Sequence, residues 1–146
     1  MVELLEPTVL LVDDEAPFVD TMTKRLTKRK LSVLKAFSGE ESLEVLKANT
    51  QIDVVILDVK MPGMDGIETL KEIRKEYPLV EVIMLTGHAT VETSIEGMRL
   101  GAFDYLMKPC DMDVLMEKVS AATKKKRDHE EKIREARVNA ILKSRS

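Results

Sequence analysis

The stretch DVVILD at residues 53–58, followed by VKMPGMDG at residues 59–66, decides the fold. Its unbroken apolar run is rich in β-branched residues and predicts a buried strand. The strand cannot continue past Pro62, which lacks an N–H group, and the glycines around it favour a turn. Ligands bind at the carboxyl ends of strands in open parallel sheets. Asp58 is therefore the first candidate for chemistry.

Outside this stretch, strand-like runs alternate with helix-like patterns. Further strands are predicted at 8–12, 31–37, 80–85 and 103–107. Helical spacing of apolar residues marks the segments between them: Phe18, Met22 and Leu26; Leu43 and Leu46; Ile67, Leu70 and Ile73; Val91, Ile95 and Met98; Leu115 and Val119. Pro17, the Ser38 capping box, Asp65 or Gly66, and Asp111 stand where the first, second, third and fifth helices should begin. Strict alternation with short connections predicts an α/β protein whose parallel sheet is covered on both faces.

Length and composition favour one domain with an appendage. The 146 residues are 44% hydrophobic and 34% charged, with no apolar run long enough to span a bilayer. The start of the chain, residues 1–6, is acidic and lacks the basic region of a secretory signal. A single cysteine, Cys110, fits a reducing compartment. We expect a soluble cytoplasmic protein with no membrane partner.

Charge divides the chain near residue 123. Residues 124–146 hold nine Lys or Arg against four Asp or Glu, whereas the rest of the chain is acidic. The last segment has no Gly or Pro and favours a helix that continues the one before it. The predicted units are a domain at 1–122 and a charged helical extension or linker at 123–146.

Reactive side chains follow four of the five predicted strands: Asp13 and Asp14, Asp58, Thr86, and Lys108. Each alone has a structural explanation, such as helix capping or a surface lysine. Their joint position at strand ends favours a shared site. Three clustered carboxylates repel one another unless a cation lies among them, and an all-oxygen site suits Mg²⁺. Asp58 could then attack a phosphoryl group and form an aspartyl-phosphate, with Lys108 and Thr86 contacting its oxygens.

These residues, with Met61–Gly66, Thr86-Gly87 and the run Gly101–Pro109, make residues 7–122 resemble a response-regulator receiver domain of two-component signalling. The resemblance implies a doubly wound, flavodoxin-like (βα)5 fold with strand order 2-1-3-4-5, the order known for a chemotaxis member of the family. It also implies that Asp58 is the phosphoacceptor. Asp14, Asp58 and the Lys60 backbone carbonyl would bind Mg²⁺ directly, and Asp13 would act mainly through water.

The resemblance also assigns a switch. Thr86 and Lys108 would contact the phosphoryl group, and Tyr105 would change rotamer as Thr86 moves. Without the resemblance, Tyr105 reads as an ordinary core or rim aromatic. The Lys108–Pro109 bond is typically cis in this family.

We expect the protein to accept a phosphoryl group from a sensor histidine kinase or a phosphotransfer protein docked near Pro17–Arg25. It would signal to a downstream effector through the face of the fourth helix, fifth strand and fifth helix. No enzymatic activity is expected beyond its own phosphorylation and dephosphorylation. Lys60 and His88, two residues after Asp58 and Thr86, predict a long-lived phosphoryl state, unless both are merely solvated surface residues.

The alternative is a degenerate or truncated receiver that serves as a dimerisation or binding module. The segment from Thr86 to Lys108 is similar to receivers of sigma-54-dependent activators, so the extension could be a cut linker. It could also be a solvated helix or a dimerising one, giving a homodimer, although Lys126 and His129 interrupt its apolar spacing. Nucleic-acid binding through Lys124–Arg127 is disfavoured, because four basic residues without a recognition motif usually form a solvated helix face.

Two enzyme-like classes fit poorly. A haloacid-dehalogenase-type phosphatase also forms an aspartyl-phosphate, but it expects a second Asp where this chain has Lys60. A Rossmann domain expects a glycine-rich turn where this chain has Asp13-Asp14.

Overall fold

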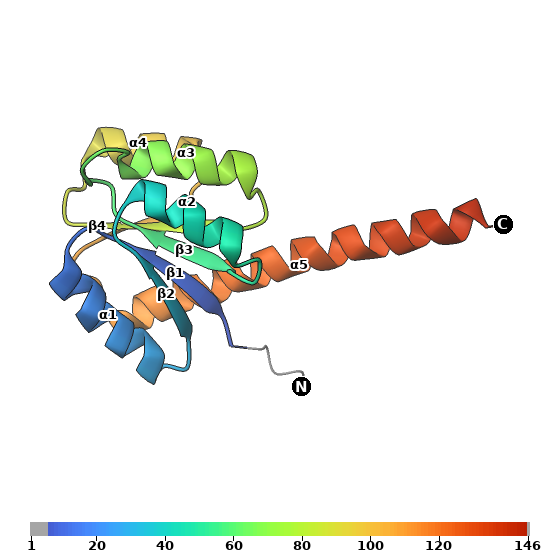
Figure 1. The fold of residues 1–146 in the computed structure, drawn as a ribbon, viewed down its shortest axis with the longest axis horizontal. Coiled ribbons are helices and arrows are strands. Elements are labelled where there is room, and N and C mark those ends of the chain that lie inside the picture. The colour runs from blue at the N-terminus through green and yellow to red at the C-terminus, as the bar shows by residue number, and fades with distance from the viewer. Residues whose placement is uncertain (1–5, 146) are drawn as a thin grey trace.

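Five parallel strands form a sheet between two layers of helices in the computed structural model, which describes residues 6–145 (Figure 1). The elements, in chain order, are β1 (Thr8–Val12), α1 (Ala16–Lys28), β2 (Ser32–Ala36), α2 (Gly39–Ala48), β3 (Val54–Leu57), α3 (Gly66–Glu76), β4 (Glu81–Thr86), α4 (Val91–Arg99), β5 (Asp104–Met107) and α5 (Met112–Ser144). The strand order is β2-β1-β3-β4-β5. This confirms the predicted doubly wound fold. The expectation about a secretory signal rests mainly on residues outside the described part.

The sheet has a separate apolar core on each face. α1 and α5 cover one face, and α2, α3 and α4 cover the other (Figure 1). Alternate residues of a strand point to opposite faces, so Leu10 and Val55 enter one core while Val9 and Val54 enter the other. Because both faces are covered, the central strands are continuous apolar runs.

Local caps begin the helices where the sequence predicts. Ser38 Oγ accepts from the Glu41 N–H at the start of α2, and Asp65 forms a reciprocal capping box with Glu68 at the start of α3. Asp111 caps α5 by accepting from the Asp113 N–H at 2.8 Å. Such caps satisfy backbone donors that have no partner within the helix.

α4 differs from α1, α2 and α3 because its large apolar side chains face solvent. Val91, Ile95 and Met98 are 71%, 52% and 47% exposed. Their spacing predicted the helix correctly, but Gly97 is its buried residue. α4 therefore presents an apolar outer surface.

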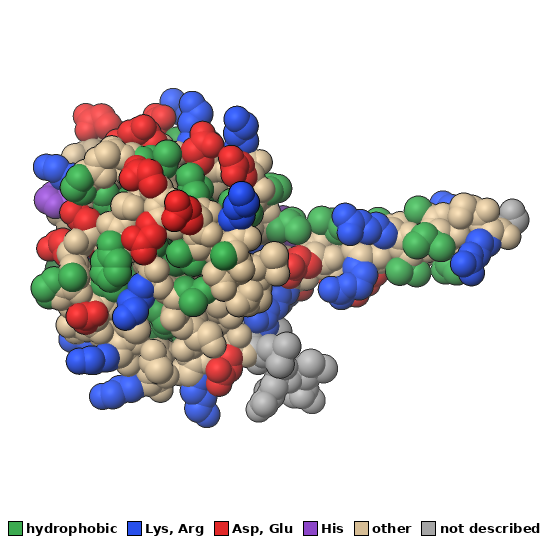
Figure 2. Space-filling model, viewed as in Figure 1, with side chains coloured by type: hydrophobic (Ala, Val, Ile, Leu, Met, Phe, Trp, Pro, Cys, Tyr) green, Lys and Arg blue, Asp and Glu red, His purple; other side chains and the backbone are tan. Residues whose placement is uncertain are grey.

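α5 runs without interruption into the charged segment and leaves the body as a straight rod (Figure 1), which confirms the predicted extended C-terminal helix. Lys126 is only 5% exposed, its Nζ lying 3.3 Å from Asp53 Oδ1 at the start of β3. The solvated face predicted for Lys124–Arg127 is thus wrong at Lys126, because a buried carboxylate draws it inward. Farther out, apolar and basic side chains share the rod's surface (Figure 2). Within residues 6–145, no helix combines the length and the apolarity needed to cross a membrane.

Candidate functional site

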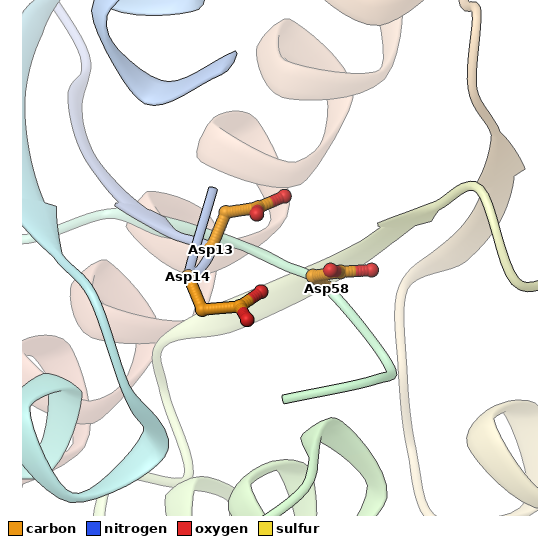
Figure 3. Close-up of side chains that lie close together, drawn as sticks. All are labelled: Asp13, Asp14 and Asp58. Atoms are coloured by element: carbon orange, nitrogen blue, oxygen red, sulfur yellow. The ribbon is translucent and has the colours of Figure 1, made fainter. Parts of the chain in front are cut away.

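Three aspartates meet at the carboxyl edge of the sheet (Figure 3). Asp13 and Asp14 follow β1, and Asp58 follows β3. One oxygen of each carboxylate lies within 4.8 Å of the other two. Asp13 and Asp58 are buried, whereas Asp14 is exposed. The structure thus brings together the three carboxylates that the sequence placed at strand ends.

The turn after β3 fixes Asp58. Its N–H donates to the Val12 carbonyl at 3.0 Å, which extends the ladder between β1 and β3 by one residue. Its Oδ1 accepts from the Val59 N–H at 2.9 Å. The chain then returns so closely that a Cβ at Gly66 would lie 1.9 Å from the Asp58 carbonyl oxygen. Only glycine fits there, so the motif at residues 59–66 folds the start of α3 directly over the Asp58 backbone.

Lys108 reaches this cluster from the end of β5. Its Nζ lies 2.6 Å from Asp13 Oδ2 and 4.0 Å from Asp58 Oδ2. Two contacts escaped the sequence analysis: Glu15 Oε1 at 3.8 Å and the Phe18 ring, whose centroid is 3.8 Å from Nζ. Phe18 follows Asp14 by four residues in the first turn of α1, a spacing that could have indicated it. The Lys108–Pro109 bond is cis, as the family resemblance implies.

The electrostatics of Asp58 favour binding of a cation. Burial is the main cause that raises its carboxyl pKa, and the charge of Asp13 adds to the rise. The Thr86 hydroxyl, the charge of Lys108 and the Val59 N–H lower the pKa of Asp58 in opposition. The ionised cluster is therefore costly in the protein alone. An all-oxygen donor set of this kind fits Mg²⁺, and the residues present can hold it.

Thr86 and Tyr105 occupy separate positions in this structure. Thr86 is fully buried at the end of β4, and its Oγ1 accepts from the His88 N–H at 3.0 Å. Tyr105 is half-buried on β5, and its hydroxyl lies 2.7 Å from Thr93 Oγ1 on α4. The structure therefore places the tyrosine hydroxyl on α4.

Lys60 and His88 are exposed at the rim of the site. Both line an open cavity of about 480 Å³, together with Asp14, Glu15, Met61 and Pro62. The cavity adjoins the three-aspartate cluster through Asp14. The roles of the Lys60 carbonyl and of both side chains stay predictions.

Fold and site together define a flavodoxin-like α/β protein with an acidic, lysine-bearing edge. The family model of the response regulator receiver domain matches residues 9–120, and the chain belongs to this family. The predicted resemblance is confirmed.

Relatives and solved structures agree with this membership. The chain is 38% identical over 112 residues to the DNA-binding transcriptional regulator NtrC of Klebsiella pneumoniae, covering 77% of this chain and 24% of that protein. It is 39% identical over 118 residues to the transcriptional regulatory protein ZraR of Escherichia coli strain K12, covering 79% and 26%. The chain thus spans about a quarter of these relatives. A response regulator receiver domain protein from Clostridium thermocellum superposes with a TM-score of 0.79 at 37% identity, covering 83% of this chain and 97% of that one. An adenylate cyclase structure from Rhodopirellula baltica gives 0.84 at 30% identity, covering 91% and 98%.

Proposed function

We propose that the chain is a phosphorylation-activated switch in which Asp58 accepts a phosphoryl group from a sensor histidine kinase or a phosphotransfer protein. The observation that supports this is the buried Asp58 carboxylate within a three-aspartate cluster, 4.0 Å from Lys108. Membership of the receiver family supports the same reaction.

In the proposed step, an Asp58 oxygen attacks the phosphorus of a phosphohistidine. The new O–P bond forms as the P–N bond breaks, and the leaving imidazole nitrogen keeps the electron pair and takes up a proton. Asp13, Asp14 and Asp58, with the Lys60 carbonyl, would hold Mg²⁺. When bound, the ion supplies positive charge that neutralises the carboxylates and the phosphoryl oxygens.

Two side chains of the protein complete the site. Lys108 would exchange part of its contact with Asp13 for the phosphoryl oxygens, because its Nζ already lies between the two carboxylates. Thr86 would donate its hydroxyl to the phosphoryl group, since it ends the strand next to β3 and its hydroxyl lowers the pKa of Asp58. In this proposal the chain catalyses only its own phosphorylation and dephosphorylation.

Partners would bind at two faces. α1 around Pro17–Arg25 would dock the phosphoryl donor, as in the family. An effector protein would bind the face of α4, β5 and α5, where Val91, Ile95, Met107 and Val114 are exposed. We place this signalling in the cytoplasm.

Intact-mass spectrometry after incubation with acetyl phosphate and Mg²⁺ tests the reaction. We expect one phosphoryl increment that disappears without Mg²⁺ and in Asp58→Ala. Glu44→Ala, an exposed change on α2, should retain the increment. An increment that persists in Asp58→Ala would refute the assignment of the phosphoacceptor.

The long helical extension favours a second candidate, a degenerate receiver that acts as a dimerisation or binding module. Ile133, Val138, Ile141 and Leu142 are exposed on it. Absence of any phosphoryl increment, together with a dimer in sedimentation, would favour this function.

A further inference from the structure

Tyr105 is held in a slot on α4 by two contacts one helical turn apart. Its hydroxyl lies 2.7 Å from Thr93 Oγ1. Its ring packs beside Gly97, where an added Cβ would stand 3.4 Å from Cδ2 and 3.8 Å from Cε2. Residues four apart lie on the same face of a helix, so Thr93 and Gly97 together form the slot. A Cβ at position 97 would stand in van der Waals contact with the ring, so Gly97 lies directly beside it.

The Thr93 hydroxyl also belongs to the cap of α4. Its Oγ1 accepts from the Thr90 N–H at 3.1 Å, while the Thr93 N–H donates to Thr90 Oγ1 at 3.0 Å. Thr93 Oγ1 also lies 2.9 Å from Thr90 Oγ1 and 3.2 Å from the Thr90 carbonyl oxygen. A hydroxyl donates one hydrogen bond and accepts two. If Tyr105 donates to Thr93, the Thr93 hydroxyl accepts twice and gives its own proton to Thr90, so every capacity is used.

A short path joins this cap to the phosphorylation site. Thr86 Oγ1 accepts from the His88 N–H at 3.0 Å, and Thr90 caps α4 two residues after His88. A shift of Thr86 would therefore act on the loop that ends at the cap. Thr93 lies at the junction between this loop and Tyr105.

We propose that Thr93 is a positioning residue that retains Tyr105 on α4 and so sets how readily the ring leaves for the Thr86 side. The proposal rests on the proposed function, because only a switch gives the departure a consequence. Departure requires loss of the Tyr105–Thr93 hydrogen bond, while the Thr90–Thr93 cap can stay intact. The Thr93 hydroxyl thus biases the protein toward the resting arrangement.

A double-mutant cycle measures this coupling in the unphosphorylated protein. Thr93→Val, Tyr105→Phe and the double variant would be compared with the original chain by urea denaturation. Thr93→Val also removes a capping contact, but that loss is common to both sides of the cycle and cancels. A single hydrogen bond predicts a coupling of roughly two- to twelve-fold in the unfolding equilibrium constant. Additive effects of the two substitutions would overturn the proposal.

Fluorine NMR follows the ring itself. The chain has two tyrosines, Tyr77 and Tyr105, so 3-fluorotyrosine gives two signals that Tyr77→Phe assigns. Thr93→Val should shift the Tyr105 signal toward its phosphorylated position before any phosphate is added. Thr93→Ser, which keeps the hydroxyl, and Thr50→Val, an exposed control in a turn, should leave it unmoved. An unshifted Tyr105 signal in Thr93→Val would contradict the retaining role.

Phosphorylation with acetyl phosphate separates the two proposals. In one outcome, phosphorylation moves the Tyr105 signal while the Thr93→Val substitution alone does not. That result would refute the role of Thr93 and leave the switch standing. A measured Thr93–Tyr105 coupling with a Tyr105 signal that phosphorylation does not move would refute the switch role of Tyr105. The contact between the two residues would then be structural only.

Discussion

The two edges of the sheet both bring acidic and basic side chains together, but in different proportions. At the carboxyl edge, Asp13, Asp14 and Asp58 lie within one small cluster, and among residues 6–145 Lys108 forms ion pairs with it. Negative charge therefore exceeds positive charge at a place that remains open to solvent through Asp14.

At the amino edge, acidic and basic groups compensate one another. Asp53 accepts the Thr8 N–H at 2.9 Å and pairs with Lys126 at 3.3 Å and Arg127 at 3.1 Å. Glu81, next to it in the sheet, is buried with its Oε1 3.7 Å from Lys125 Nζ, a charge pair in which neither carboxylate oxygen accepts a hydrogen bond from any described residue. The cluster closes the sheet edge and fastens α5 to it.

The comparison teaches that the balance of charge distinguishes a binding site from a charge cluster that only holds the fold together. An edge with an excess of carboxylates is costly until a ligand arrives, and so it is prepared to bind one. An edge whose carboxylates are already paired has no need of a ligand and resists change.

Breaking the amino edge should have the largest effect. Asp53→Ala would remove the buried carboxylate that both Lys126 and Arg127 contact, although Lys126 would keep Glu130 at 3.2 Å. Removing one partner of a buried pair costs about 3–5 kcal/mol of unfolding free energy, which urea denaturation would measure. Glu44→Ala should change it by less than about 0.5 kcal/mol. A loss of unfolding free energy below about 1 kcal/mol for Asp53→Ala would mean that this charge cluster does not hold the fold together.

Magnesium should distinguish the edges. At ten times its dissociation constant, a ligand adds about 1.4 kcal/mol, or about 3–6 °C in melting temperature for a chain of this size. We expect this rise in the original protein and its loss in Asp14→Asn, measured by thermal denaturation. Lys125→Met at the amino edge should keep the rise. An equal rise in Asp14→Asn would show that the ion binds elsewhere.

Neutralising Asp58 should stabilise the protein in the absence of Mg²⁺. Because burial raises the pKa of Asp58, folding favours its protonated form, and ionised Asp58 lowers stability at neutral pH. Asp58→Asn should gain on the order of 1 kcal/mol at pH 7, with EDTA present, because it removes a buried charge and, to a smaller extent, its repulsion with Asp13.

The direction of the Asp58 pKa shift gives a pH test of this prediction. The advantage of Asp58→Asn should shrink as the pH falls through the raised pKa and vanish below the ordinary value of 3.8, where the carboxyl is protonated in both states. Urea denaturation at several pH values would measure it. An advantage that stayed constant with pH would indicate a packing effect rather than a charge effect.

The smallest expected effect concerns Lys60 and His88 at the rim of the carboxyl edge. Lys60→Asn combined with His88→Ala should accelerate loss of the phosphoryl group about threefold, equivalent to roughly 0.7 kcal/mol in the barrier. Intact mass followed over time would give the rate. Lys71→Asn, an exposed change on α3, serves as the control. An unchanged rate would make both residues ordinary surface side chains.

Local patterns explain why most of the fold could be predicted. Continuous apolar runs, capping residues such as Ser38 and Asp111, and helical spacing all act over a few residues. The site followed from the same logic, because Asp13, Asp58 and Lys108 each stand directly after a strand. The strand order came from family resemblance, because spacing alone leaves several orders open.

Long-range partners could not be read in this way. Asp53 and Lys126 are 73 residues apart, and no local pattern connects them. The Thr93–Tyr105 bond likewise depends on how α4 lies against β5. At α4, periodicity predicted a helix correctly but could not say whether its apolar side would be covered.

The charge cluster of Asp53, Lys126 and Arg127, which holds α5 to the sheet, also has a mechanical consequence. From Asp128 to Ser144 the helix continues for 17 residues, which at 1.5 Å per residue is about 25 Å. A tilt of about 10° at its base would move the tip by about 4 Å, because displacement grows with distance from the base. An angular change too slight to notice in the body would be plain at the far end of the rod.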